Sequence, residues 1–249
     1  MGAVKNLIYR ILHFLGLYPG IYFIRSPFKI HEFFELLKGV SITPQDVILD
    51  LGCGRGLQTM VLGRCCQRIV GTDASESLIE IARRMTRLLG LDRTVEFECR
   101  KVEDYTFGPE IFDKIFSICV LEHIPHYREI LGLLYRYLKR DGQIIFSVDS
   151  LATIQDPQII EQHKQDHHVA HYYTPAELTS LLEETGYRDI TVYPIFRSGY
   201  ARDLFSQGVR NQFQYGILDS CLKYWKLKKE EEACENHTKG IFLVAKCRK

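Results

Sequence analysis

Three features are missing from this sequence, and each excludes a class of protein. None of the eight cysteines belongs to a CxxC pair, so the spacing that closes a structural zinc site is missing. We therefore expect reduced thiols, a cytoplasmic location and no bound metal. Charge of one sign is missing too, because 32 Lys and Arg face 31 Asp and Glu, for a formal net charge of +1. No overall electrostatic field therefore favours the binding of nucleic acid or of an acidic partner.

A long apolar run is the third missing feature. The most apolar segment near the start has its hydrophobic residues at helical spacing, and Arg10 and Pro19 interrupt it well short of the roughly 20 residues that a bilayer crossing needs. It predicts an amphipathic helix with two interpretations. The helix packs over the domain, or residues 4–24 contact a membrane surface, helped by the apolar stretch GIYFI at 20–24.

The sequence does contain a regular alternation of strand-like and helix-like segments. With 249 residues and 46% apolar residues, it can build a large core. Strands are expected at 46–51, 68–73, 94–99, 114–120, 142–148, 188–193 and 240–246. Helices are expected at 56–66, 76–90, 126–139 and 175–185. This order predicts an α/β fold with a mainly parallel sheet covered by helices.

Two segments depart from the alternation. Residues 149–173 are polar and rich in histidine, which predicts loops, and residues 194–239 predict a helical cap inserted before the last strand. We divide the chain into a lead-in at 1–45, a core at 46–193 and 240–249, and the cap within the same domain. The aromatic residues of the cap have two interpretations, an apolar acceptor pocket or the small core of the cap itself. Its excess of Lys and Arg suits either an anionic surface or simple solubility.

A glycine-rich turn follows the first strand, in VILDLGCGRG at residues 47–56. Gly52, Gly54 and Gly56 allow a sharp turn and the close approach of a ligand to the backbone; a tight turn without a ligand is the structural alternative. The dinucleotide fingerprint GxGxxG does not fit, because Leu57 stands where it needs glycine, and no P-loop Gly-Lys-Ser/Thr follows. Asp50 in front of the turn would repel a phosphate and attract an ammonium group.

A second acid supports a nucleoside ligand. Asp73 ends the next expected strand about 20 residues later, where a carboxylate can accept both hydroxyls of a ribose. From here the sequence resembles the class I S-adenosylmethionine-dependent methyltransferases, in particular the small-molecule group with the ubiquinone and menaquinone biosynthesis enzymes. The resemblance rests on VILDLGCGRG (47–56), IVGTDASESLIEIAR (69–83), FDKIFSICVLEHI (112–124), LKRDGQIIFSV (138–148) and HYYTPAELTSLLEETGY (171–187).

The resemblance implies a fold, a cofactor and a set of contacts. The fold is a Rossmann-like sheet of seven strands in the order 3-2-1-4-5-7-6, with the last strand antiparallel. The cofactor is S-adenosyl-L-methionine. Asp50 reaches its ammonium group and Asp73 holds its ribose. The remaining implied contacts are Gly52, Cys53 and Gly54 on the methionine part and Ala74 beside the adenine.

The resemblance also implies contacts at two further positions. Lys101 stands where the family normally has an acid for the adenine amino group, so the adenine contacts pass to the Val102 amide and to Glu103. Cys119, at the end of the fourth strand, should face the methionine part, with a buried core thiol as its alternative. The departure at Lys101 concerns only the detail of the adenine contacts.

Methyl transfer from a sulfonium needs alignment and, for some acceptors, a general base. The candidates for the base are His168 and His171, in a run that also includes His163 and His167. Solvated loop histidines are the alternative, and a metal site would require the run to be helical.

We therefore expect a methyltransferase acting on a small, aromatic or lipophilic acceptor. The rival is an inactive cofactor-binding scaffold at a membrane or protein assembly. An Asn/Asp-Pro-Pro-Tyr/Phe block is missing after the fourth strand, where CVLEHI stands, which disfavours nucleobases and glutamine as acceptors. The sequence does not indicate the oligomeric state.

Overall fold

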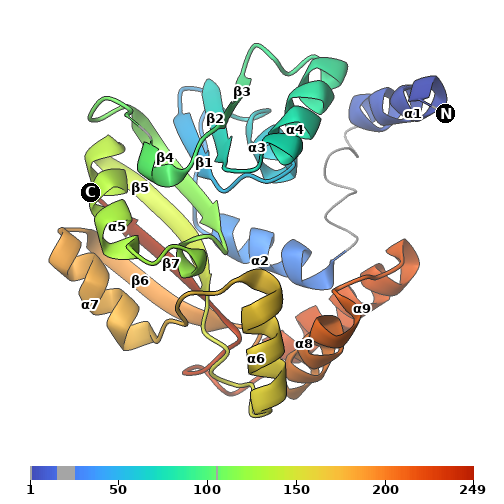
Figure 1. Cartoon of the computed structure of the whole chain (residues 1–249), viewed down its shortest axis with the longest axis vertical. Coiled ribbons are helices and arrows are strands. Elements are labelled where there is room, and N and C mark those ends of the chain that lie inside the picture. Colours follow the sequence, from blue (N-terminus) through green and yellow to red (C-terminus); the bar gives the residue numbers. More distant parts are fainter. Residues whose placement is uncertain (1, 16–25, 105) are drawn as a thin grey trace.

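The computed structural model describes residues 2–15, 26–104 and 106–249, and its centre is a seven-stranded sheet (Figure 1). The strands run in the order β3-β2-β1-β4-β5-β7-β6. β7 pairs antiparallel with both β5 and β6, and the other pairs are parallel. The expected order and the antiparallel last strand are confirmed. The strands are β1 (Val47–Leu51), β2 (Arg68–Asp73), β3 (Val95–Cys99), β4 (Phe112–Ile118), β5 (Leu138–Asp149), β6 (Arg188–Ile195) and β7 (Phe242–Arg248).

Helices cover both faces of the sheet, and each face has its own apolar core. One core includes residues of α5 and α7, and the other includes residues of α2, α3, α4 and α8. The central strands are therefore buried on both sides, as a parallel sheet requires. The helices are α1 (Gly2–Phe14), α2 (Pro27–Leu37), α3 (Leu57–Leu62), α4 (Glu76–Leu89), α5 (Tyr127–Tyr137), α6 (Pro157–His167), α7 (Pro175–Thr185), α8 (Gly199–Asn211) and α9 (Ile217–Glu232).

One expectation about local structure was wrong. Residues 149–173 are not only loops, because they contain α6. Asp156 caps this helix by accepting a hydrogen bond from the Gln158 amide at 2.9 Å, and Pro157 fills its first turn. An N-cap acid followed by proline is a helix start signal that outweighs the polar composition of the segment.

The cap at 194–239 is helical, as expected, and it packs on α2 from the lead-in (Figure 1). Phe196 and Phe205 are fully buried, and their rings lie edge to face with Phe28 of α2 at 4.9 and 6.0 Å between centroids. These aromatic side chains therefore form a core that joins the cap to α2. The structure favours the core interpretation for them over the pocket interpretation.

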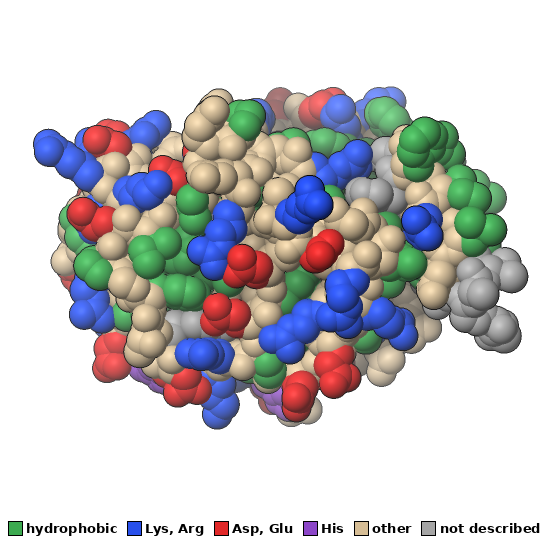
Figure 2. Space-filling view, turned by 90° about the horizontal axis from the view of Figure 1, so that it is seen from above, with side chains coloured by type: hydrophobic (Ala, Val, Ile, Leu, Met, Phe, Trp, Pro, Cys, Tyr) green, Lys and Arg blue, Asp and Glu red, His purple; other side chains and the backbone are tan. Residues whose placement is uncertain are grey.

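Apolar side chains remain exposed at one end of the molecule. On α1, Tyr9 and Leu12 pack against the core, whereas the side chains of Leu7, Ile8, Ile11, Phe14 and Leu15 are 49 to 89% exposed. Figure 2 shows apolar side chains gathered at the right-hand end, beside the residues that are not described. Of the segment 4–24 expected to contact a membrane, residues 16–24 lie outside the described part. No described helix is long and apolar enough to cross a membrane.

Candidate cofactor site

The glycine turn links β1 to α3 with three left-handed residues. Gly52, Gly54 and Gly56 have φ angles of 69°, 54° and 72°. A Cβ atom at Gly52 would collide with the side chain of Val120, and one at Gly56 would collide with the ring of Phe97. Glycine is thus required both by the backbone conformation and by the lack of space.

Asp73 fixes the turn from the neighbouring strand. Its Oδ2 accepts a hydrogen bond from the Gly54 amide at 2.9 Å, and its Oδ1 accepts one from the Ser75 amide at 2.9 Å. Each carboxylate oxygen can accept a second hydrogen bond. Asp73 is only half-buried, so it can hold the turn and still receive hydroxyl groups of a ligand.

Asp50 has a different environment, although it also ends a central strand. It is 1% exposed, and its carboxylate accepts hydrogen bonds from Gln58 Nε2 at 2.7 Å and Thr59 Oγ1 at 2.5 Å. Burial raises the pKa of Asp50 to about 7, with these hydrogen bonds opposing the shift and the charge of Asp73 adding to it. Asp50 therefore ties the end of β1 to the first turn of α3.

Two cavities lie on either side of the glycine turn. The Asp73 cavity encloses about 430 Å³ and the Asp50 cavity about 300 Å³. Gly52 and Ile118 line both, so the cavities adjoin between the ends of β1 and β4. The chain adds β2 and β3 on one side of β1, and then adds β4 and the later strands on its other side, so β1 and β4 mark the point where the strand order reverses. That is the place where open α/β sheets bind ligands.

The structure gathers most of the expected cofactor residues around these cavities. The Asp73 cavity is lined by Gly52, Asp73, Ala74, Val102, Glu103 and Cys119, and the Asp50 cavity by Asp50, Gly52 and Cys53. Gly54 and Gly56 line neither cavity but shape the turn between them. Lys101 also faces the Asp73 cavity. The Glu103 carboxylate lies 2.9 Å from Nε2 of His126.

The two candidate bases lie away from both cavities. His168 is exposed and ends α6 in the left-handed conformation, with a φ of 53°. His171 places Nε2 2.8 Å from a Glu177 carboxylate oxygen and stacks on the ring of Tyr127. His163, earlier in the same run, is buried, with Nδ1 3.2 Å from the Tyr172 hydroxyl and Nε2 3.6 Å from Asp149.

Helix α2 contributes to a group of buried polar residues that no sequence motif indicated. Glu32 is fully buried and accepts hydrogen bonds from Lys29 at 2.9 Å and from Ser147 at 2.7 Å. The Cys119 thiol lies 3.0 Å from the same carboxylate. Lys29 also lines the Asp50 cavity, so α2 supplies part of its wall. Ser26 followed by Pro27 is the start signal that could have located this helix.

Comparison with known proteins agrees with this geometry. Residues 42–186, more than half of the chain, match the family described as methyltransferase domain. The chain is 30% identical over 154 residues to a ubiquinone biosynthesis O-methyltransferase of Coxiella burnetii, covering 58% of this chain and 65% of the relative. It is 31% identical over 137 residues to a sterol 24-C-methyltransferase of Eremothecium gossypii, covering 55% and 36%. The matches thus span less than two thirds of each relative.

A solved structure shows the same fold. Phosphoethanolamine N-methyltransferase 2 of Haemonchus contortus, in complex with S-adenosyl-L-methionine, superposes with a TM-score of 0.64 at 18% identity, covering 88% of this chain and 52% of the other. At this identity the likeness concerns the fold alone. The family match over residues 42–186 is what assigns the sequence. The chain belongs to the family of methyltransferase domains.

Proposed function

We propose that the protein transfers a methyl group from S-adenosyl-L-methionine to a small molecule. The observation that carries the proposal is the pair of adjoining cavities at the glycine turn, one with Asp73 for a ribose and one with Asp50 for an ammonium group. Placed across Gly52, an S-adenosylmethionine would have its two polar ends near carboxylates of matching chemistry. Cys53 and Cys119 then line opposite parts of the same site.

Isothermal titration of the purified chain with S-adenosylmethionine and, separately, with NAD tests the cofactor. We expect saturable binding of S-adenosylmethionine alone. Asp73→Ala should lower its affinity by about 1.5 to 3 kcal/mol, since it removes charged hydrogen bonds to the ribose. Asp92→Ala, at an exposed position outside both cavities, is the matched control and should bind as the wild type does.

Two results would overturn the cofactor proposal. Preference for NAD would mean that the glycine turn binds a dinucleotide, and equal affinity of Asp73→Ala and wild type would remove Asp73 from the site. Because Asp73 also holds the Gly54 amide, thermal unfolding of the variant must be measured alongside. A cooperative transition in the variant shows that the fold is retained.

For the acceptor, we propose a small aromatic or lipophilic molecule and no nucleic acid. The curated relatives are named for ubiquinone precursors and sterols, and the structural relative for phosphoethanolamine. Their names cover methylation of oxygen, carbon and nitrogen, so the attacked atom must be measured. Release of S-adenosylhomocysteine with panels of catechols, phenols, quinols and sterols tests the class. Turnover with DNA or RNA and with none of these small molecules would contradict it.

We also propose a cytoplasmic protein that contacts a membrane surface through α1. The support is the row of exposed apolar side chains on α1, opposite the face that packs on the core. Leu218, Leu222 and Trp225 on α9 are also exposed, and α9 lies on the same side of Figure 1 as α1. Lys226 and Lys229 on α9 are exposed and suit an anionic surface. Contact with a bilayer would bring the site close to lipophilic acceptors.

A further inference from the structure

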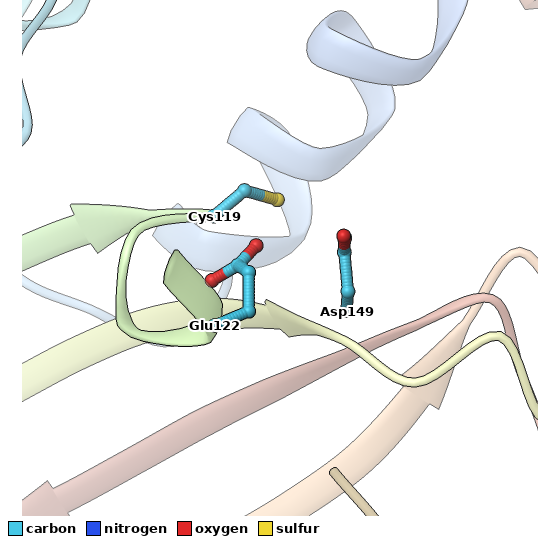
Figure 3. A group of neighbouring side chains, drawn as sticks. All are labelled: Cys119, Glu122 and Asp149. Carbon is cyan, nitrogen blue, oxygen red and sulfur yellow. The ribbon is translucent and has the colours of Figure 1, made fainter. Parts of the chain in front are cut away.

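We propose that Cys119, Glu122 and Asp149 form a binding site for a divalent metal ion. One donor atom from each residue lies within 4.8 Å of the other two (Figure 3). Cys119 follows β4 and Glu122 lies three residues later in the short helix Leu121–His123, whereas Asp149 ends β5 and is brought to them by the fold. The proposal concerns metal binding and stands independently of methyl transfer.

Glu122 is the observation that points to a ligand. Its side chain is 0% exposed, and neither carboxylate oxygen has a hydrogen-bond partner among the described residues. Figure 3 shows its carboxylate beside the Cys119 thiol and on the same side as Asp149. Its own carbonyl accepts hydrogen bonds from the Ala170 and His171 amides, which holds the residue in place. A buried carboxylate without partners costs several kcal/mol unless a cation or a proton balances it.

The neighbouring cations do not supply that balance. Lys29 is already paired with Glu32, a third buried carboxylate that lies beside Cys119. The His163 ring lies 3.6 Å from Asp149, and even a protonated ring would balance only one of the carboxylates. The cluster therefore carries more acid than base.

The donor set selects the kind of metal. One thiolate with two carboxylates suits Zn²⁺ or another transition metal better than Mg²⁺ or Ca²⁺, which prefer oxygen alone. Bonds of about 2.0 to 2.3 Å place tetrahedral ligand atoms roughly 3.5 Å apart, so each pair of donor atoms would have to close by no more than about 1.3 Å. Three protein ligands leave a coordination position for water or another oxygen. Cys119 also lines the Asp73 cavity, so the metal would adjoin the proposed cofactor site.

Cobalt(II) provides a direct test, because a thiolate bound to it gives a charge-transfer band in the near ultraviolet. The full chain is freed of metal with a chelator, kept reduced and titrated with CoCl₂, and Zn²⁺ is then added in competition. We expect the band to saturate at one equivalent and to disappear when Zn²⁺ is added. Cys119→Ser should abolish the band, and the isosteric changes Glu122→Gln and Asp149→Asn should each weaken binding at least tenfold.

Cys65→Ser is the matched control, since this cysteine is exposed and lies outside the cluster. It should keep the band at the same affinity. The proposal fails if the wild type binds no stoichiometric metal, or if the band survives Cys119→Ser and is lost with Cys65→Ser. Zn²⁺ should also raise the thermal midpoint of the wild type by more than that of Glu122→Gln, because the variant binds the ion more weakly. An equal rise in both proteins would place the metal elsewhere.

Discussion

At the scale of single residues, the aspartates Asp50 and Asp73, near the ends of two neighbouring strands, differ in burial and in hydrogen-bond partners. Both were expected to bind the cofactor directly. Asp73 is half-buried and keeps an accessible edge toward a cavity. Asp50 is buried and satisfied by Gln58 and Thr59, so much of its role is structural. The sequence distinguishes neither environment, because burial depends on the strands that lie on each side.

The pH dependence of stability tests the burial of Asp50. Its pKa of about 7 in the folded state exceeds the value of about 3.9 for an exposed Asp. Between these values the folded protein holds a proton that the unfolded chain has released, so the contribution of this group to stability falls as pH rises. Asp50→Asn has no such proton. Relative to wild type, its free energy of unfolding should rise by about 2 kcal/mol from pH 5 to pH 8.

Urea unfolding at several pH values without cofactor measures this difference. The exposed change Asp92→Asn is the control and should show a pH-independent difference from wild type. The Asn side chain also loses one of the two hydrogen bonds that Asp50 accepts, which lowers stability equally at every pH. A flat difference for Asp50→Asn between pH 5 and pH 8 would show that Asp50 is ionised throughout this range.

At the scale of elements, the same start signal opens three helices. Ser26-Pro27, Asp156-Pro157 and Thr174-Pro175 each combine an N-cap oxygen with a proline in the first turn. Only the third was used to predict a helix. The first two fell in segments described as lead-in and loop, and only the second of these segments, residues 149–173, was assigned from its polar composition. Helices α2 and α6 place Glu32 and His163 beside the end of β5, so this omission hid the polar cluster.

The connection between β1 and α3 gives a prediction about packing. At Gly56 an added methyl group would meet the Phe97 ring, and the φ of 72° disfavours any side chain. At Gly90, which ends α4, φ is 68° and no atom lies within 4 Å. Both Gly→Ala changes should cost about 1 kcal/mol for the backbone, and Gly56→Ala should cost about 1 to 3 kcal/mol more for the clash.

Chemical denaturation of the two variants under identical conditions isolates the packing contribution. Since the backbone term is shared, the difference between the variants reports the contact with Phe97. The double change Gly56→Ala with Phe97→Leu should recover part of the loss, because it removes the ring that the methyl group meets. Equal destabilisation by Gly56→Ala and Gly90→Ala would show that the ring moves aside without cost.

At the scale of the whole molecule, the apolar surface is concentrated at one end. The exposed large apolar side chains of the described part lie on α1, α2 and α9, and Figure 2 shows apolar side chains gathered at this end. A protein surface rarely exposes so many grouped apolar side chains without a partner. The remaining surface mixes both signs of charge, which agrees with the net charge of +1.

Co-sedimentation with vesicles tests the membrane contact of this end. The double change Ile11→Glu with Phe14→Glu should lower the fraction bound to anionic vesicles at least about tenfold, because it places two charges in the apolar row of α1. The double change Leu222→Glu with Trp225→Glu tests in the same way whether α9 contributes to vesicle binding. The control Gln67→Glu with Gln214→Glu adds the same charge at exposed polar positions. Equal binding by the α1 variant and the control would exclude α1 as the contact.

The sequence by itself determined the alternation of strands and helices, the glycine turn and the acids beside it. These features follow from local periodicity, from the need for positive φ after β1, and from motifs that lie within short stretches of chain. Strand and helix bounds agree within a few residues where an apolar period or a cap marks them. The family resemblance, confirmed by the match to residues 42–186, supplied the strand order that periodicity leaves open.

Only the tertiary structure decided which polar groups meet at the site. Cys119 and Glu122 lie three residues apart, but Glu32 and Asp149 come from segments far from them in sequence, and the burial of all four arises from α2 lying over the ends of β4 and β5. His168 and His171, which share the expected histidine run, face other partners because α6 ends between His163 and them. Desolvation and the distance between charges set the chemistry of these groups, and both depend on packing that no local pattern encodes.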